Sequence, residues 1–503
     1  MNKKTVFSAV CLLLLAVILS LALLSCEKEH EHTESAWIYD ERATCAVSGQ
    51  RHRECTECGE VLEEEEYIVG HQYEDEICVF CETPRYGIDF LEYREITLDG
   101  VVGYEIVGIG NCTGNKLDIP ALRRNKPVLS IAASAFKNNE KLISVHIGKN
   151  VRRIGEGAFE GCKKLTTVTF SDNSLLKTIG NRALINCTSL ESFAFPSGVA
   201  ALPDSVFYNC TALKTVVLSD AMTSFGANAF DGCFKIEALE VNGLRYLPTK
   251  TNPTFMVYGV VDSKATAYSI ADTAKAVGPD AFGGCRGLLS IAIPEGVLYI
   301  GESAFEGCAS LAAVSLPTSL SVIGSSAFAG CISLAEVTLP ASLTALGERA
   351  FVDCTQLSAV RLDSTKLSFV GANVFGGTKF QPTLFEGGYY LCDQNGSFSV
   401  LLGVAEGLAA LSVAAGTRVV ADAAFYGVST LTAVTLPASL VTLGAEAFSG
   451  CTALDAVTFA AGTAWYLAEN PFVTAGEAAD VTDAAAAADK LTGEWLYRYL
   501  KKV

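Results

Sequence analysis

One seventeen-residue segment recurs along the chain and limits its fold more than any other feature. It reads IGEGAFEGCKKLTTVTF from Ile154, IGESAFEGCASLAAVSL from Ile300 and IGSSAFAGCISLAEVTL from Ile323. Most neighbouring copies repeat at the interval that separates Phe136 from Phe159. A short fixed period of this kind indicates a solenoid, in which each coil covers the apolar face of the next. The phenylalanine of the Ala-Phe pair, replaced once by leucine, lies at Phe136, Phe159, Leu184, Phe207, Phe230, Phe282, Phe305, Phe328, Phe351, Phe375, Phe425 and Phe448.

Each part of the repeat predicts a local structure. Residues 165–170, LTTVTF, alternate apolar and small polar residues, which favours a short strand with Val168 and Phe170 facing inward. Pro or Ser-Asp then ends the strand, since proline has no N–H to donate. In the following Ile-Gly pair, glycine permits a tight bend. The Ala-Phe-x-Gly-Cys stretch predicts one short helical or 3₁₀ turn that buries the phenylalanine.

A cysteine lies three residues after most of these phenylalanines. Cysteine is small, apolar and easily buried, so a column of cysteines can fill a narrow bend. Metal or redox chemistry instead requires thiolates in an exposed electropositive site, and the repeat supplies no such surroundings. Parallel side chains also suit disulfide geometry poorly. We predict buried free thiols at Cys162, Cys187, Cys210, Cys233, Cys285, Cys308, Cys331, Cys354 and Cys451.

The repeat pattern IPxxLxxIGxxAFxGCxxLxxVxL resembles the BspA-like leucine-rich repeats of bacterial and some protist surface proteins. The resemblance covers residues 110–465 approximately. It implies a leucine-rich repeat solenoid with a parallel sheet on its concave face, and adhesion to host or microbial proteins. We accordingly expect an N-terminal cap and first coil at 86–130, the solenoid at 131–465 and a C-terminal cap at 466–503. In the C-terminal cap, Thr482 or Asp483 is the expected N-cap of an alanine-rich helix.

The period is interrupted twice, and both interruptions are rich in aromatic residues. We expect each to be a degenerate coil that carries a hairpin, near 244–278 and 380–420. One constant shift aligns Asn252 with Asn395 and Phe255 with Phe398 without a gap, which indicates a copied block. Because binding hot spots favour large aromatic side chains, these rings are candidate partner-binding residues; alternatively, they cap the degenerate coils. The candidates are Phe255, Tyr258, Tyr268, Tyr389, Tyr390 and Phe398.

Residues 1–26 contain two lysines, a long apolar run and a final Leu-Leu-Ser-Cys. This composition is typical of a signal peptide, although the apolar run is also almost long enough for a transmembrane anchor. The last four residues resemble the bacterial lipoprotein signal, which implies that Cys26 is diacylated and becomes the new N-terminus. Two or more acyl chains anchor a protein stably. We therefore expect an exported protein, anchored by lipid at the bacterial cell surface or outer membrane.

Residues 27–85 form a small segment in which Asp and Glu far outnumber Lys and Arg. It contains two Cys-x-x-Cys pairs, Cys55/Cys58 and Cys78/Cys81. The spacing within and between these pairs predicts a zinc ribbon, in which four thiolates hold a structural Zn²⁺. Disulfides are the alternative in an exported protein.

The same segment also resembles short exported bacterial modules that combine histidine and cysteine. That resemblance adds His32, Cys45 and His71 as alternative ligands. In this arrangement His32 and Cys45 join the first Cys-x-x-Cys pair, and His71 joins the second, which then lacks a fourth ligand. The ligand set therefore stays open at this stage.

Charge and residue usage argue against several functional classes. The net charge of −18 disfavours nucleic acid and acidic membrane surfaces as main partners. His146 is the only histidine of the repeats, and the sequence has no Gly-rich phosphate loop, GxSxG or HExxH motif, so we do not expect an enzyme. The predicted function is binding of a protein or glycan ligand on host or neighbouring cells. The alternative is a structural spacer of the cell envelope with no specific ligand.

Overall fold

The computed structural model describes residues 33–36, 38–41, 49–56, 61–67, 73–74, 77–78, 91–110, 114–226, 228–468 and 476–503. The chain divides into two compact units, residues 1–87 and 88–503. In unit 1, β1 (Ile38–Glu41), β2 (Gly49–Glu54) and β3 (Val61–Tyr67) form an antiparallel sheet. A separate hairpin pairs β4 (Tyr73–Glu74) with β5 (Ile77–Cys78).

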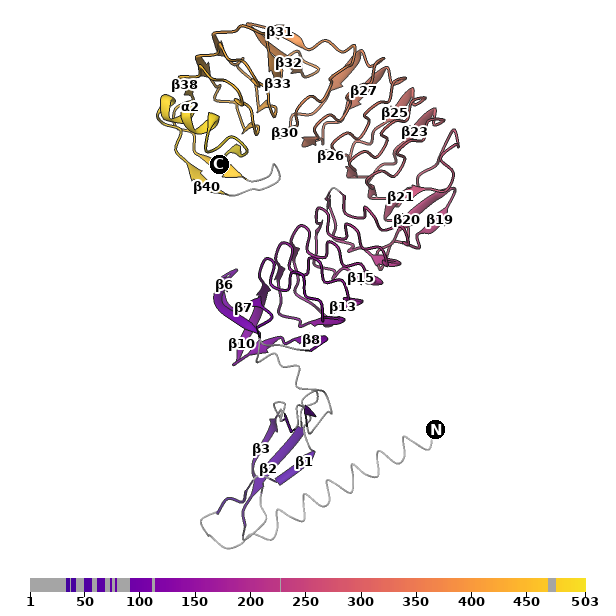
Figure 1. Ribbon diagram of the computed structural model, residues 1–503, viewed down its shortest axis with the longest axis vertical. Coiled ribbons are helices and arrows are strands. Elements are labelled where there is room, and N and C mark those ends of the chain that lie inside the picture. The colour runs from indigo at the N-terminus through magenta and orange to yellow at the C-terminus, as the bar shows by residue number, and fades with distance from the viewer. Residues whose placement is uncertain are drawn as a thin grey trace. The chain divides into compact units, whose positions relative to one another are not determined.

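Unit 2 is a stack of coils, as the repeat predicts, and Figure 1 shows successive coils side by side. Each regular coil contributes one strand of three or four residues from the LTTVTF part of the repeat. These strands pair in parallel with the strands of neighbouring coils. They are β8 (Lys116–Ile119), β11 (Ser144–Ile147), β13 (Thr167–Phe170), β15 (Ser192–Ala194), β17 (Thr215–Val217), β23 (Ser290–Ala292), β25 (Ala313–Ser315), β27 (Glu336–Leu339), β29 (Ala359–Leu362), β34 (Ala410–Ser412), β36 (Ala433–Thr435) and β38 (Ala456–Thr458).

A second row of parallel strands, which the sequence did not predict, runs through the residues just before the repeated glycine. Each strand has only two residues, too few for a detectable alternation. They are β12 (Arg153–Ile154), β14 (Thr178–Ile179), β16 (Ala201–Leu202), β18 (Ser224–Phe225), β22 (Ala276–Val277), β24 (Tyr299–Ile300), β26 (Val322–Ile323), β28 (Ala345–Leu346), β30 (Phe369–Val370), β35 (Val419–Val420) and β37 (Thr442–Leu443).

The two rows lie on different sides of the coils. In Figure 1, β26 and β30 lie on the inner side of the curve of the C-terminal coils, whereas β25 and β27 lie toward the outer side. The longer strands are therefore not the inner row, contrary to the expected concave sheet. The repeated glycine has a different role as well. A Cβ atom on Gly347 would lie 2.3 Å from the amide nitrogen of Ser325, so glycine is needed for close approach of coils rather than for a bend.

The Ala-Phe segment is a run of turns and not the predicted helical or 3₁₀ turn. In all twelve copies the residues two before and two after the phenylalanine position have positive φ, for example Ser303 at 51° and Gly307 at 69°. Left-handed residues reorient every second amide toward the next coil. Thus the N–H of Phe305 donates to Ala327 O at 2.7 Å, while the N–H of Ala304 stays within its coil and donates to Gly301 O. The segment adds a third row of hydrogen bonds between coils.

The repeated phenylalanines stack in the core. Rings of Phe282, Phe305, Phe328 and Phe351 follow one another with centroids 4.8–5.1 Å apart and interplanar angles of 2–7°. All four side chains are fully buried. One coil therefore buries the ring of the next, which is the condition for a repeat that cannot fold alone.

Each interruption contains a three-stranded antiparallel meander. Meander 1 is β19 (Leu239–Val241), β20 (Leu244–Leu247) and β21 (Met256–Val260). Meander 2 is β31 (Thr383–Phe385), β32 (Gly388–Cys392) and β33 (Phe398–Val404). The last strand of each rejoins the two-residue row, because β21 pairs in parallel with β22 and β33 pairs in parallel with β35.

The meanders divide the hydrophobic core into three clusters. In meander 2, Leu391 and Val400 belong to the central cluster, whereas the neighbouring residues Tyr390 and Leu401 belong to the C-terminal one. Successive side chains of a strand point to opposite faces. Each meander thus covers the ends of two coil stacks at once.

The two meanders match each other when Tyr246 is aligned with Tyr390, one position away from the gapless alignment expected from the sequence. Each of these buried tyrosines accepts a backbone N–H at its hydroxyl, from Ala271 and Ala414 respectively. Lys275 N donates to Phe255 O, and its counterpart Arg418 N donates to Ser399 O. Phe255 therefore corresponds to Ser399 and not to Phe398, so the gapless alignment is wrong within the meanders. The segment that follows meander 2 is therefore one residue shorter than the segment that follows meander 1.

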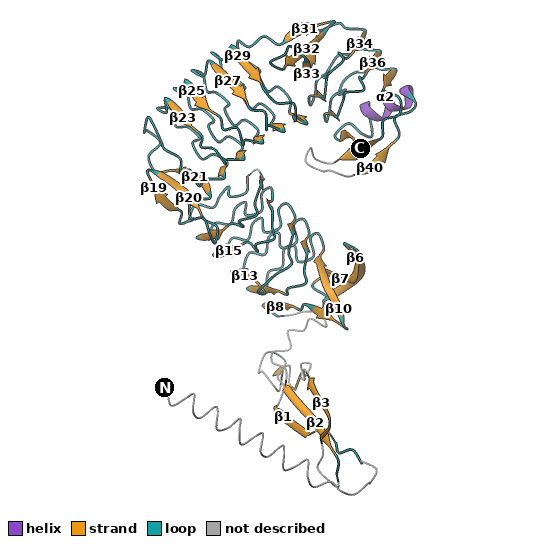
Figure 2. Cartoon of the chain, turned by 180° about the vertical axis from the view of Figure 1, so that it is seen from behind, coloured by secondary structure: helices purple, strands orange, loops and turns teal. Residues whose placement is uncertain are grey.

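Both ends of unit 2 are covered by elements outside the repeat, as Figure 2 shows. At the N-terminal end, the antiparallel pair β6 (Glu92–Leu98) and β7 (Val101–Gly108) precedes β9 (Leu122–Arg123) and β10 (Lys126–Ile131). At the C-terminal end lie β39 (Trp465–Ala468), β40 (Glu477–Ala479), α2 (Ala484–Thr492) and β41 (Tyr499–Lys502).

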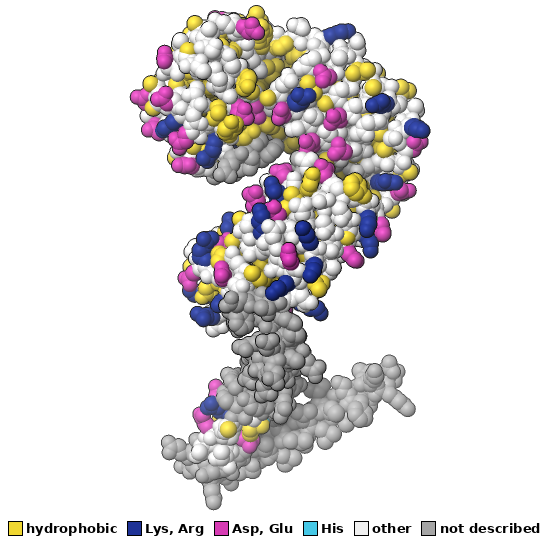
Figure 3. Space-filling model, viewed as in Figure 1, with side chains coloured by type: hydrophobic (Ala, Val, Ile, Leu, Met, Phe, Trp, Pro, Cys, Tyr) yellow, Lys and Arg dark blue, Asp and Glu magenta, His cyan; other side chains and the backbone are white. Residues whose placement is uncertain are grey.

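The C-terminal elements close a sheet edge that would otherwise invite edge-to-edge association. β41 pairs antiparallel with β37, and Asp483 is the N-cap of α2, as expected. On the face of the molecule in Figure 3, basic and acidic side chains are interspersed over unit 2. Within the described ranges, no helix has the length and apolar character needed to cross a membrane.

Candidate functional site

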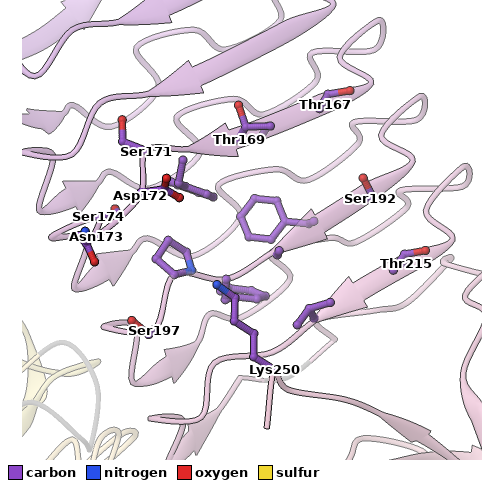
Figure 4. Close-up of a pocket in the computed structure, with 17 residues that line it drawn as sticks. Thr167, Thr169, Ser171, Asp172, Asn173, Ser174, Ser192, Ser197, Thr215 and Lys250 are labelled. Carbon is purple, nitrogen blue, oxygen red and sulfur yellow. The ribbon is translucent and has the colours of Figure 1, made fainter. Parts of the chain in front are cut away.

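A groove of about 700 Å³ lies over β13, β15 and β17, and we call it the hydroxyl groove (Figure 4). It is lined by residues of three successive coils and by Lys250, which precedes the last strand of meander 1. Its lining is rich in hydroxyl groups, those of Thr167, Thr169, Ser171, Ser174, Ser192, Ser197 and Thr215.

The floor of the groove is the outer surface of the longer strands. Thr167, Ser192 and Thr215 are in register across β13, β15 and β17, so their hydroxyls follow one another from coil to coil. The floor also contains the half-buried ring of Phe170, which packs edge-on against the buried Phe193 with centroids 5.7 Å apart. A hydroxyl can donate and accept at the same time, so this floor offers both functions along its length.

One wall is a loop at residues 171–174, in a coil that is slightly longer than most others. Asp172 and Asn173 are exposed on this loop. His146 fixes the base of the wall, because its Nδ1 lies 3.0 Å from Thr169 Oγ1 and its Nε2 lies 3.1 Å from Ser171 Oγ. The only histidine of the repeats therefore orients two hydroxyls that line the groove.

The other wall carries Lys250, on a loop tied to the preceding coil. The N–H of Leu218 donates to Pro248 O at 2.8 Å. The Thr251 hydroxyl donates to Asp220 Oδ1 at 2.6 Å, and the Thr249 hydroxyl donates to the same oxygen. These hydrogen bonds lower the pKa of Asp220. A charged Asp220 thus holds the loop that carries Lys250. Figure 4 shows the Lys250 side chain among the residues that line the groove.

The corresponding place in the next block of coils has different side chains. In the alignment that pairs Tyr246 with Tyr390, Glu336, Arg361 and Gln394 stand where the groove has Ser192, Val217 and Lys250. Arg361 Nη2 donates to Gln394 Oε1 at 3.2 Å, and Arg361 Nε donates to Asp363 Oδ1 at 3.0 Å. Glu336 thus replaces the Ser192 hydroxyl there, and Arg361 and Gln394 form a hydrogen bond with each other, so the hydroxyl groove is a feature of the first block.

The predicted buried thiols are confirmed for the nine repeat cysteines, each of which is buried and free of disulfides. The thiol also has a specific partner in most coils: Cys331 Sγ, for example, donates to Phe305 O of the preceding coil at 3.2 Å. Burial raises the pKa of Cys162 to about 11 and that of Cys308 to about 12. Because the nucleophile is the thiolate, burial and the raised pKa values disfavour reaction of these thiols near neutral pH.

The six candidate aromatic residues of the interruptions differ in burial. Phe255 and Tyr390 are 4% and 0% exposed, so their rings face the core and not a partner. Tyr258, Tyr268, Tyr389 and Phe398 are half-buried. Their role in partner binding stays a prediction.

Two of these half-buried tyrosines line small pockets beside the meanders. Tyr258 lines a pocket of about 210 Å³ with Arg245 and Asp280. Tyr389 lines an apolar pocket of about 240 Å³ beside meander 2. Both are smaller than the hydroxyl groove and fall below the usual range for ligand sites.

Sequence reasoning missed the hydroxyl groove. Its walls come from a lengthened coil and from a loop that lies far beyond the last floor strand, Thr215–Val217, in the chain. The one available signal was the interval between Phe159 and Leu184, which is longer than the interval between Phe136 and Phe159.

The predicted metal and lipid residues fall largely outside the described residues, namely Cys26, His32, Cys45, Cys58, His71 and Cys81. Cys55 is buried and forms a β-bridge with Glu34, and Cys78 ends β5. Within the described part of the chain, no group of three or more His, Cys, Asp or Glu is arranged to hold a metal ion. Zinc binding and lipidation therefore stay predictions.

Comparison with protein families identifies the class of the solenoid. Residues 129–251, 262–386 and 407–474 match the BspA type leucine-rich repeat region, in six copies. The matched segments make up more than half of the chain, so the chain belongs to this family. None of the curated proteins compared with the chain matches it.

Several solved structures are similar to parts of the chain. A leucine-rich repeat protein of T. pallidum is 25% identical over 49% of this chain and 89% of its own, with a TM-score of 0.30. A leucine-rich cell surface protein of Faecalibacterium prausnitzii is 20% identical over 74% and 93%, with a TM-score of 0.26. A leucine-rich repeat protein of Bacteroides ovatus is 22% identical over 75% and 76%, with a TM-score of 0.25.

Proposed function

We propose that this protein is a non-enzymatic cell-surface protein that binds a macromolecular ligand in the hydroxyl groove. Membership of a leucine-rich repeat family that is typical of surface proteins supports the class. The observation that carries the proposal is the groove itself, a cavity of about 700 Å³ that only stacked coils and the Lys250 loop together create. Binding sites are concave and largely preformed, and this groove has both properties.

The chemistry of the groove supports binding rather than catalysis. His146 and Ser171 are within hydrogen-bond distance, which in isolation resembles a base and a nucleophile. However, the other ring nitrogen of His146 bonds to the hydroxyl of Thr169. A Ser-His-Asp triad requires a buried carboxylate at that nitrogen to orient the ring and stabilise its charge.

A matched pair of variants tests the function. Ala194→Arg places a long side chain on an exposed floor position of β15, and Thr338→Arg places the same side chain at the corresponding position of β27. Both variants and the wild-type full chain are applied to an array of host surface proteins and glycans. We expect wild type and Thr338→Arg to bind the same ligand and Ala194→Arg to lose at least tenfold in affinity. Specific binding by none of the three would instead favour the spacer alternative.

Anchoring and metal binding are further parts of the proposal. The Leu-Leu-Ser-Cys ending supports diacylation of Cys26, and the two Cys-x-x-Cys pairs support a structural Zn²⁺ held by Cys55, Cys58, Cys78 and Cys81. Mass spectrometry of the exported protein, with Cys26→Ser as control, tests the lipid. Zinc content of the full chain, with Cys58→Ser and His71→Ala compared, tests the ligand set. Disulfides between these cysteines, with no bound zinc, would contradict the metal site.

A further inference from the structure

The lining of the hydroxyl groove restricts the chemistry of its ligand. Seven hydroxyl groups, each both a donor and an acceptor, are joined by the Asp172 carboxylate, the Asn173 amide and the Lys250 ammonium. A ligand that pairs with all of them must itself alternate donors and acceptors at short intervals. The exposed carbon atoms of that ligand need only a small apolar surface, which the half-buried Phe170 ring provides.

A peptide fits this surface poorly. β13 pairs with β11 and β15, and β15 pairs with β13 and β17, so these two floor strands offer no edge to which an extended peptide adds. β17 ends the sheet, and Leu218 directly after it forms a β-bridge with Thr249 of the loop that carries Lys250. The lining residues include no Trp, Tyr or Arg, the residue types that carry most of the energy in protein interfaces. Recognition must therefore come from side-chain hydrogen bonds along the floor.

We propose that the ligand of the hydroxyl groove is an oligosaccharide. This inference rests on the proposed function and specifies its ligand. Sugar hydroxyls supply donors and acceptors at close spacing, and the C–H faces of a sugar ring pack on the Phe170 ring. The volume of about 700 Å³ lies within the usual range for ligand sites.

The polar groups of the groove are held in place before a ligand arrives. His146 orients the hydroxyls of Thr169 and Ser171, and Asp220 holds the loop that carries Lys250. A site whose side chains are already fixed loses less conformational entropy when a ligand binds. This matters here because each hydrogen bond to the ligand replaces a hydrogen bond to water and contributes little net free energy. The next block provides the internal contrast, since Arg361 and Gln394 there bond to each other and leave fewer free polar groups.

The proposal is tested with defined oligosaccharides, neutral and acidic, in an array followed by calorimetric titration of the full chain. Thr215→Val removes one floor hydroxyl with little change of shape, and Lys250→Gln introduces the residue found at position 394. Thr338→Val is the matched control in the next block. We expect wild type and Thr338→Val to bind an oligosaccharide equally. Thr215→Val and Lys250→Gln should each weaken binding by about tenfold, the equivalent of one good hydrogen bond.

The groove-filling variant Ala194→Arg separates failure of this inference from failure of the proposed function. Oligosaccharide binding that survives Ala194→Arg would overturn the inference, because the site would lie elsewhere. If no oligosaccharide binds but a protein ligand does, and Ala194→Arg abolishes that binding, the ligand class is wrong while the function stands. If wild type binds neither class, both proposals fail.

Discussion

The regular coils and the two meanders pair their backbone N–H and C=O groups, and bury their apolar side chains, in different ways. In a coil, amides such as that of Phe305 donate to the next coil, and repeated Phe rings stack on one another, as Phe305 does on Phe328. In a meander, strands pair with their neighbours within the same segment and present alternate side chains to two different core clusters. A coil needs identical neighbours, whereas a meander needs only an apolar surface on each side.

This difference explains where variation is tolerated in the molecule. Coil positions that face their own copies keep glycine, phenylalanine and cysteine, because a change in one coil affects the next one too. The meanders depart from the repeat pattern, and the loop with Lys250 belongs to the first of them. The hydroxyl groove lies at such a boundary, between three regular coils and the first meander.

Among the substitutions that compare coils with meanders, Phe328→Ala is expected to have the largest effect on stability. Its fully buried ring lies between those of Phe305 and Phe351, so its loss leaves a cavity that both neighbours line. We expect a loss of about 3–5 kcal/mol in the free energy of unfolding, measured by urea denaturation. The half-buried meander residue Phe398 is the comparison, and Phe398→Ala should cost clearly less. Equal losses would show that coil stacking has no special weight.

Glycine substitutions compare a coil with a meander directly. A Cβ on Gly347 would lie 2.3 Å from backbone of the preceding coil, whereas a Cβ on Gly259 in β21 would meet nothing within 4 Å. Gly347→Ala should therefore destabilise the protein by about 1–3 kcal/mol, since the coils must separate locally. Gly259→Ala should change stability by less than about 0.5 kcal/mol, as at other surface positions. The free energy of unfolding of both variants is measured by thermal denaturation. A Gly347→Ala variant as stable as wild type would show that a Cβ atom fits between the coils at this position.

Asp422 lies where meander 2 ends and coils resume. Its N–H donates to Val370 O at 3.0 Å across the interruption, and its Oδ1 accepts the N–H of Ala445 at 2.9 Å. Burial raises the pKa of Asp422 to about 7, and the nearby negative charges of Glu348 and Glu446 contribute to the rise. The folded state therefore retains a proton here at a pH where the unfolded chain has lost it.

This raised pKa predicts a pH dependence of stability. The contribution of Asp422 is fully present below the unfolded pKa of 3.8 and is lost as pH rises through about 7. Asp422→Asn, which carries no charge at any pH, should thus gain stability relative to wild type between pH 5 and 8, on the order of 1 kcal/mol. Urea titrations at several pH values measure this. A constant difference between variant and wild type across that range would contradict the raised pKa.

The smallest expected effect is the reactivity of the repeat thiols toward a soluble thiol reagent in the native state. Burial and raised pKa values suppress the thiolate at Cys162 and Cys308, so we expect no measurable labelling of repeat cysteines at pH 7. Labelling in denaturant is the control and should reach all of them. Cys392, in meander 2 and half-exposed, is the internal comparison and should react first. Rapid native labelling of coil cysteines would mean that the coils open readily.

Much of the fold was predictable because the residue pattern of one repeat indicates the structure of every coil. The period, the strand within residues 165–170, observed as Thr167–Phe170, and the burial of Phe and Cys all follow from patterns within one coil. The two-residue strands and the alternating turns of the Ala-Phe segment were not predictable in this way. Two residues show no alternation, and Ser303 or Arg349 gives no local sign of a positive φ. The candidate site was missed for a related reason, because Thr215 and Lys250 meet only through the packing of meander 1 on the coils.

The sequence by itself determined that unit 2 is a stack of like coils that bury the repeated phenylalanines and cysteines. Repetition makes this possible, because each residue of a periodic chain has its own copy as neighbour, so one period describes the packing of all. Only the tertiary structure decided which row of strands lies on the inner side, how the meanders divide the core and where a polar groove forms. Those outcomes depend on contacts between non-equivalent segments, and no local pattern encodes them.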